Sequence, residues 1–228
     1  MKKIIFGIFA HPDDEAFGPC GTLLQEARSG TDIHLIMLTA GDAGTNLHGT
    51  SDLGEVRLQE WKKAGELLGT KGMHFLGYQD GHLDNTAMPK IAQQIAEIVT
   101  STLADTSVDT VVEFMCFDFT GLSGHIDHIV ASRAACLAFY RLQEQDTRLR
   151  RIRLFCLPAS LYPSHNIDWL YKEAGCSEDK IDETIDARVL REEIIQIMRT
   201  HETQLQDCEA ILRVHGDQLG LNHFVVKT

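Results

Sequence analysis

Short apolar runs rich in branched side chains alternate along the chain with segments whose apolar residues recur at helical spacing. The runs predict five strands, at residues 4–9, 33–38, 73–76, 110–114 and 152–157. The helical spacing predicts core-facing helices over residues 58–68, 91–99 and 190–198. Strands that alternate with helices in this way are typical of βαβ units. The sequence therefore predicts an α/β protein with a Rossmann-like fold, in which helices flank a mostly parallel sheet.

The length of the chain and its polar stretches fit one domain. A single α/β domain can occupy 228 residues, and no linker or repeat divides them, so residues 1–228 are predicted to form one domain. Two long polar stretches, residues 41–54 and 79–86, are expected as binding loops at the carboxyl edge of the sheet. Residues 158–182 show no periodicity and carry no prediction.

Charge and composition narrow the range of partners. The formal net charge of -12 argues against nucleic acids, because their recognition depends on Lys and Arg side chains that neutralise phosphates. The basic cluster at residues 148–153 is interpreted as the solvated end of a helix that leads into a strand. No apolar run reaches the roughly 18 residues that a membrane helix needs, and the start of the sequence lacks a signal-peptide cleavage site. We therefore expect a cytoplasmic protein with neither nucleic-acid nor membrane partners.

The six cysteines also favour a cytoplasmic protein. They show no C-x-x-C spacing, so they are expected to be mostly buried free thiols in a reducing environment.

One histidine and three acids, AHPDDE at residues 10–15, follow directly after the first predicted strand. In open α/β sheets the ligand crevice lies outside the carboxyl ends of the strands. Imidazole and carboxylate groups at that place can hold a divalent metal. Taken alone, the run also fits an acidic, solvated loop.

A second motif, GHIDH at residues 124–128, offers two imidazoles three residues apart. If this segment opens a helix, His125 and His128 lie on one face of it, with Asp127 beside them. A catalytic metal needs three protein ligands that converge. Together the two motifs can supply them.

These two motifs resemble the signatures of the LmbE-like (PIG-L) family of zinc-dependent N-deacetylases. Four shorter motifs extend the resemblance along the chain: LTAGDAG at 38–44, R-x-x-E at 57–60, LGYQDG at 76–81 and HETQ at 201–204. The sequence departs from the family at residues 18–21, GPCG, where a glycine-rich turn is usual, and at Ile126, where a proline is common. Neither departure removes a candidate ligand.

The resemblance implies a metal site made by His11, Asp14 and His128. Two imidazoles and one carboxylate leave positions open for water and substrate, which suits catalytic zinc (Zn²⁺) or, as the alternative, ferrous iron (Fe²⁺). Such an ion lowers the pKa of bound water from 15.7 towards about 7, so that hydroxide can attack an acetamide at neutral pH.

The resemblance also implies roles for the neighbouring side chains. Asp13 is the expected general base, because burial beside other acids raises the pKa of a carboxylate. His125 is expected to stabilise the oxyanion and to protonate the leaving amine. Asp127 is expected to orient a histidine and to favour its charged form.

Three residues outside the two motifs are expected to bind substrate: Asp42, Arg57 and Asp80. Glu60 is one helical turn from Arg57, and the two form either a supporting ion pair or an ordinary exposed helix pair. His201 either reaches the site or has a structural role.

The sequence therefore predicts a metal-dependent N-deacetylase that acts on a small, polar N-acetylglucosaminyl molecule or conjugate. A homo-oligomer is compatible with the resemblance. A non-catalytic metal- or sugar-binding module of the same fold is the alternative, although it would not need Asp13 and His125. A nucleotide-binding oxidoreductase would require G-x-G-x-x-G after the first strand, and an aspartyl-phosphate phosphatase would require D-x-D-G-T there; neither pattern is present.

Overall fold

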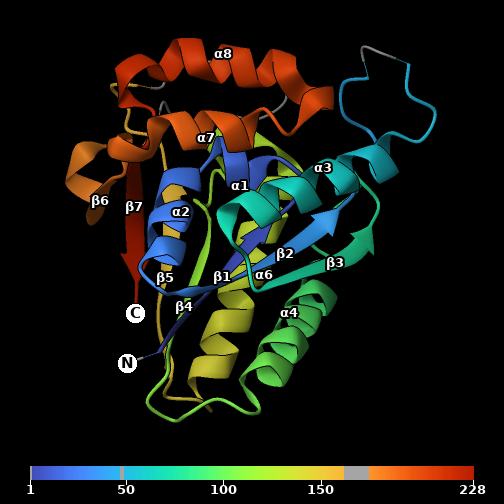
Figure 1. Ribbon diagram of the computed structural model, residues 1–228. Coiled ribbons are helices and arrows are strands. Elements are labelled where there is room, and N and C mark those ends of the chain that lie inside the picture. The colour runs from blue at the N-terminus through green and yellow to red at the C-terminus, as the bar shows by residue number, and fades with distance from the viewer. Residues whose placement is uncertain (1, 47–48, 162–174) are drawn as a thin grey trace.

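The computed structural model of the protein describes residues 2–46, 49–161 and 175–228. Strands in this part of the chain form one seven-stranded sheet: β1 (Lys3–Phe9), β2 (Asp32–Thr39), β3 (Gly72–Tyr78), β4 (Val111–Phe117), β5 (Leu149–Cys156), β6 (Glu183–Asp186) and β7 (Leu221–Lys227). Their order is β3-β2-β1-β4-β5-β7-β6 (Figure 1). The strands from β1 to β5 pair in parallel, whereas β7 is antiparallel to both of its neighbours. The predicted α/β fold with a mostly parallel sheet is confirmed.

Helices cover both faces of this sheet. The longer ones are α2 (Cys20–Arg28), α3 (Leu53–Leu68), α4 (Met88–Leu103), α6 (Ile126–Gln143), α7 (Arg191–Met198) and α8 (Leu205–His215), and α1 (Asp14–Phe17) and α5 (Gly121–Gly124) have one turn each. Side chains of α4 and α6 share one buried apolar cluster with the sheet, and side chains of α2, α3 and α7 share a second cluster with the opposite face. In Figure 1, α8 lies beyond α7 on the side away from the sheet.

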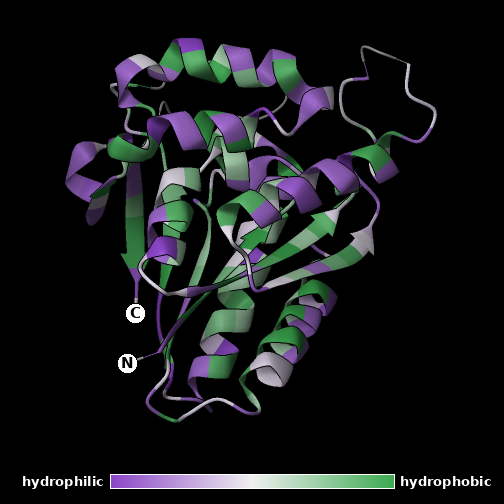
Figure 2. Ribbon diagram, in the orientation of Figure 1, coloured by the Kyte–Doolittle hydropathy of each residue, from purple (hydrophilic) through white to green (hydrophobic). Residues whose placement is uncertain are grey.

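The alternation of side chains along β1 shows why its sequence is apolar throughout. Ile4, Phe6 and Ile8 belong to the cluster under α4 and α6, whereas Ile5 and Phe9 belong to the cluster under α2, α3 and α7. Both faces of a parallel strand are covered by helices, so both sets of alternate residues must be apolar. Figure 2 shows mainly hydrophobic residues in the central strands, whereas hydrophobic and hydrophilic residues alternate along the helices.

All five strands and all three helices predicted from the pattern are present. The structure adds β6 and β7, which the apolar runs did not predict. β6 has only four residues, of which none is buried, and buried and partly exposed residues alternate in the first half of β7. Neither strand carries the continuous apolar run of a strand buried on both faces.

The interpretation of residues 148–153 as a solvated helix end is wrong. Most of them lie in β5, and the side chain of Arg153 is only 1% exposed. Its guanidinium contacts Glu26 Oε1 at 2.8 Å and Glu113 Oε2 at 2.9 Å. Two carboxylates brought from other elements therefore compensate the burial of this charge.

Other expectations concern the whole chain. All six cysteines are free, and all but Cys176 are buried. Residues 162–174, which make up much of the stretch without periodicity, lie outside the described residues. Among the residues that the structure describes, no helix has the length and apolar character needed to cross a membrane.

Candidate metal centre

Loops that follow three strands bring the predicted site residues together. His11 and Asp14 follow β1, Asp80 follows β3, and His125 and His128 follow β4. These strands are parallel, so their carboxyl ends meet at one edge of the sheet. Asp14 is the first residue of the one-turn helix α1. Glu15 is also in α1, and residues 10–13 form the turn that leads from β1 into this helix.

Ligand atoms of His11, Asp14 and His128 converge at this edge. His11 Nδ1 and His128 Nε2 lie 2.9 Å apart. Asp14 Oδ1 lies 3.2 Å from His128 Nε2, and Asp14 Oδ2 lies 3.8 Å from His11 Nδ1. Two overlapping groups could also hold an ion: His11 with His125 and His128, and His11 with Asp80 and Asp127. Every one of these groups includes His11.

The partners of the outer ring nitrogens determine what the inner nitrogens can do. His11 Nε2 lies 2.9 Å from Asp80 Oδ1 and 3.4 Å from Asp127 Oδ2. His128 Nδ1 lies 3.0 Å from the carbonyl oxygen of Gly121, which can only accept, so this nitrogen carries the proton. With both outer nitrogens protonated, the two inner nitrogens can present lone pairs to one point. A single proton or a metal cation can occupy that point.

Hydrogen bonds orient the carboxylate of Asp14. Its Oδ2 accepts from the backbone N–H groups of Ala10 at 3.0 Å and His11 at 2.9 Å. Burial alone would raise the pKa of Asp14, but His128 and His11 lower it well below its ordinary value. Asp14 is therefore an anion, and its Oδ1 is the oxygen that faces His128.

The protonation of His11 depends on its acidic neighbours. Burial alone would lower the pKa of His11, but Asp127, Asp80 and the charge of Asp14 raise it to about 10. Without an ion, His11 is cationic at neutral pH and can donate a hydrogen bond to His128. A metal ion would displace this proton.

Asp13 lies beside this trio in a strained backbone conformation. Its φ is 120°, a region that residues other than glycine rarely adopt. Arg57 Nη2 donates to Asp13 Oδ2 at 2.8 Å and to Pro12 O at 2.7 Å, and these contacts support the strained turn. Burial raises the pKa of Asp13 to about 6, although the charge of Arg57 acts in the opposite direction.

Arg57 itself is nearly enclosed, with 4% of its surface exposed. Its Nη1 donates to Gly41 O at 2.7 Å, and a Cβ on Gly41 would lie 2.5 Å from the guanidinium, so glycine leaves room for it. The proposed pair with Glu60 is absent from the described contacts. Glu60 instead accepts from the backbone N–H of Thr203 at 2.8 Å and from its hydroxyl at 2.7 Å.

The second motif opens a helix, which is the condition under which its two histidines lie on one face. His125 is the N-cap of α6, and its Nδ1 accepts from the backbone N–H of Asp127 at 3.2 Å. The rings of His125 and His128 stack with centroids 4.9 Å apart. Burial and the neighbouring charges of His128 and His11 lower the pKa of His125.

The carboxylate of Asp127 turns towards His11, a histidine of the first motif. Its oxygens accept from the backbone N–H groups of Gly81 at 2.7 Å and Leu83 at 3.1 Å, and one oxygen faces His11. Its hydrogen bond raises the pKa of His11 and so favours the charged form of a histidine, which is the role expected of Asp127.

The remaining predicted residues separate into two groups. Asp80 lies in the site, where it faces His11 and accepts from the N–H of Ala43 at 2.8 Å. Burial alone would raise the pKa of Asp80, but His11 and Ala43 lower it to about 2. Asp42 is exposed and lines a neighbouring hollow. His201 is fully buried and lies 3.1 Å from Glu15 Oε1, behind the motif.

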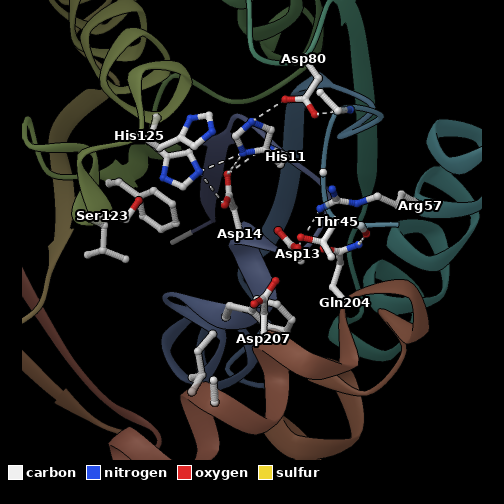
Figure 3. A pocket seen from close by; sticks show the side chains of 18 of the residues that line it. His11, Asp13, Asp14, Thr45, Arg57, Asp80, Ser123, His125, Gln204 and Asp207 are labelled. Atoms are coloured by element: carbon white, nitrogen blue, oxygen red, sulfur yellow. Dashed lines mark hydrogen bonds and ion pairs between the residues drawn. The ribbon is translucent and has the colours of Figure 1, made fainter. Parts of the chain in front are cut away.

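A cavity of about 630 Å³ lies over the candidate ligands. Figure 3 shows His125 and Ser123 on one side of the acids, Thr45, Arg57 and Gln204 on the other, and Asp207 across the cavity from Asp80. The wall that carries Asp207 is helix α8.

Residues 6–139, more than half of the chain, match the family model PIG-L, described as GlcNAc-PI de-N-acetylase. This protein belongs to the PIG-L family. A relative from Salinispora arenicola, 1D-myo-inositol 2-acetamido-2-deoxy-alpha-D-glucopyranoside deacetylase, is 26% identical over 88% of this chain and 75% of its own.

Two solved structures show how widely this fold is used. N,N'-diacetylchitobiose deacetylase from Pyrococcus horikoshii has a TM-score of 0.68 at 18% identity and covers 99% of this chain and 83% of its own. 4-Carboxy-2-hydroxymuconate hydratase from Pseudomonas putida has a TM-score of 0.68 at 16% identity, and the match covers 100% of this chain and 97% of the hydratase chain. The fold alone therefore does not decide the reaction.

The sequence did not reveal the wall that α8 adds to the cavity of this PIG-L family member. Asp207, Ile211 and His215 line the cavity at intervals of four residues, which places them on one face of the helix. That spacing is visible in the sequence, but it resembles the spacing of any core-facing helix.

Proposed function

We propose that this protein is a metal-dependent N-deacetylase that acts on an N-acetylglucosaminyl molecule. The observation that carries the proposal is the convergence of His11 Nδ1, Asp14 Oδ1 and His128 Nε2, beside a carboxylate, Asp13, that is not needed as a ligand. The choice of an acetylated amino sugar as substrate rests on the relatives, which are named as deacetylases of such sugars.

His11, Asp14 and His128 are the proposed ligands. Their donor set of two imidazoles and one carboxylate fits zinc, with ferrous iron as the alternative. An ion held there supplies a Lewis acid that polarises an amide carbonyl and acidifies water. Asp80 and Asp127 would orient His11 through its Nε2, an arrangement common among histidines that bind metals.

Asp13 is the proposed general base. Its carboxylate lines the cavity, and Arg57 fixes it from behind through a 2.8 Å contact. A pKa of about 6 suits a group that must be ionised at neutral pH and still accept a proton from water.

His125 is the proposed donor to the reacting carbonyl oxygen. Its Nδ1 accepts a backbone hydrogen bond, so the neutral ring carries its proton on Nε2. A donor fixed in this way stabilises negative charge that develops on the oxygen, and the same proton can pass to the departing amine. This role does not require a cationic histidine in the resting protein.

Polar side chains around the cavity are proposed to contact the sugar. Ser123, Gln204 and Asp207 line it, and Figure 3 shows them spread around the acids. Arg57 and Asp80 also line the cavity but are held by protein partners, so we assign them first to Asp13 and His11. Asp42 is assigned no contact with the sugar.

The test measures acetate release after the purified protein is loaded with Zn²⁺ or Fe²⁺. The substrates are N-acetylglucosamine, its glycosides and diacetylchitobiose, with acetyl-lysine peptides for comparison. Asp13→Asn should reduce turnover at least a hundredfold, whereas Asp105→Asn, an exposed carboxylate away from the cavity, should match the unchanged protein. Acetate released from no sugar would refute the proposal: release from the peptides alone would leave a deacetylase of another substrate, and release from neither would leave the binding module.

A further inference from the structure

The cavity is lined by apolar as well as polar side chains. Beside the candidate ligands and the polar groups described above, five large apolar side chains line it: Phe17, Phe117, Leu122, Leu157 and Ile211. They come from α1, the end of β4, α5, the end of β5 and α8.

These five side chains, which we call the apolar wall, line the same cavity and share one hydrophobic cluster. Phe117 belongs to the buried cluster under α2, α3 and α7, and the other four pack against that cluster. All four are only partly buried, so each contributes surface that faces the cavity. The described protein therefore leaves part of this hydrophobic layer uncovered inside its own active-site cavity.

The apolar wall begins at the candidate ligands. The ring centroid of Phe117 lies 5.0 Å from that of His128, and Leu122 follows Gly121, whose carbonyl oxygen accepts from His128. A substrate group attached close to the reacting amide would lie against this wall. A sugar hydroxyl placed there would lose water without gaining a partner, which disfavours it.

The size of the cavity supports a larger ligand than one amino sugar. Pockets of about 300–1,000 Å³ typically enclose a drug-sized molecule, and this cavity has about 630 Å³. A single amino sugar held by the polar groups would leave much of the apolar wall in contact with water. Covering such a surface with an alkyl or aryl group is favourable.

We propose that the preferred substrate carries an apolar alkyl or aryl group that packs on this wall. The group is attached to the acetylated amino sugar either as its aglycone or as an extension of its amide acyl chain. The inference rests on the proposed function and replaces the small, polar substrate expected from the sequence.

Two substrate pairs test the inference and separate the two attachments. The first compares hexyl with methyl N-acetylglucosaminide, and the second compares N-hexanoylglucosamine with N-acetylglucosamine. Each buried methylene contributes about fourfold, so two buried methylenes should raise kcat/KM at least tenfold in one pair. The pair that responds identifies the attachment.

Variants show whether the wall is responsible. Leu157→Asn and Ile211→Asn should bring the responding ratio close to one, while Val214→Asn should keep it. Val214 is on the same helix as Ile211 but is 58% exposed and does not line the cavity. A ratio of two rates does not depend on how much of each variant is folded.

A binding measurement keeps the inference independent of turnover. Calorimetry on the metal-loaded protein would compare hexyl with methyl glucosaminide and N-hexanoylglucosamine with N-acetylglucosamine. Tenfold tighter binding of the hexyl glucosaminide or of N-hexanoylglucosamine supports the apolar wall even if no sugar is deacetylated. The absence of deacetylation would refute only the proposed function. Acetate release from N-acetylglucosamine, with equal kcat/KM and equal affinity within both pairs, overturns the inference and leaves the proposed function intact.

Discussion

Replacing Arg57 by methionine tests how the site holds Asp13. The change removes a guanidinium that is 4% exposed and donates to Asp13, Pro12 and Gly41 at 2.7 to 2.8 Å. It leaves a buried carboxylate without its partner, which costs about 3–5 kcal/mol. For a protein of this length each kcal/mol lowers the melting temperature by about 2–4 °C, so we expect a decrease of about 10 °C. Arg57→Lys can restore one contact and should lose less.

The same substitution should change the pH dependence of catalysis. A positive charge 2.8 Å from Asp13 lowers the pKa of that carboxylate, so its removal must raise it. Activity that requires ionised Asp13 is lost as the pH falls through this pKa. The acid limb of kcat/KM should therefore move to higher pH in Arg57→Met.

The measurements are thermal unfolding by circular dichroism and the pH profile of acetate release. Lys62→Met is the matched control, because it removes one exposed positive charge from the same helix. If Arg57→Met melts with the control and its acid limb coincides with that of the unchanged protein, Arg57 does not hold Asp13.

Three further predictions concern the metal centre. Asp14→Ala should lose bound zinc while Asp13→Ala keeps it and loses turnover; equal zinc contents by mass spectrometry would contradict this division. A chelator should abolish activity. Because the pKa of His11 is raised to about 10, zinc must displace its proton to bind. Calorimetry should therefore show that the affinity for zinc rises about tenfold per pH unit between pH 6 and 8. His125→Ala should lower kcat about a hundredfold with zinc content unchanged, since it removes one donor to the oxyanion; loss of zinc would instead make His125 a ligand.

The sequence alone determined the fold class and the composition of the candidate site. Apolar periodicity is a local property, so it located the five parallel strands and three of the helices that pack on them. The two motifs follow directly after strand ends or open a helix. The resemblance to the family selected His11, Asp14 and His128 from these motifs, and because parallel strands end at one edge of the sheet, the structure brings the three together there.

Only the tertiary structure decided which side chains support these residues. Arg57 pairs with Asp13 across 44 positions of sequence, and Glu60 pairs with Thr203 across 143. No local pattern encodes such pairings, because they depend on how helices dock on the sheet. The apolar wall has the same origin: Ile211 looks like a core residue in the sequence, and only the packing of α8 leaves it facing the cavity.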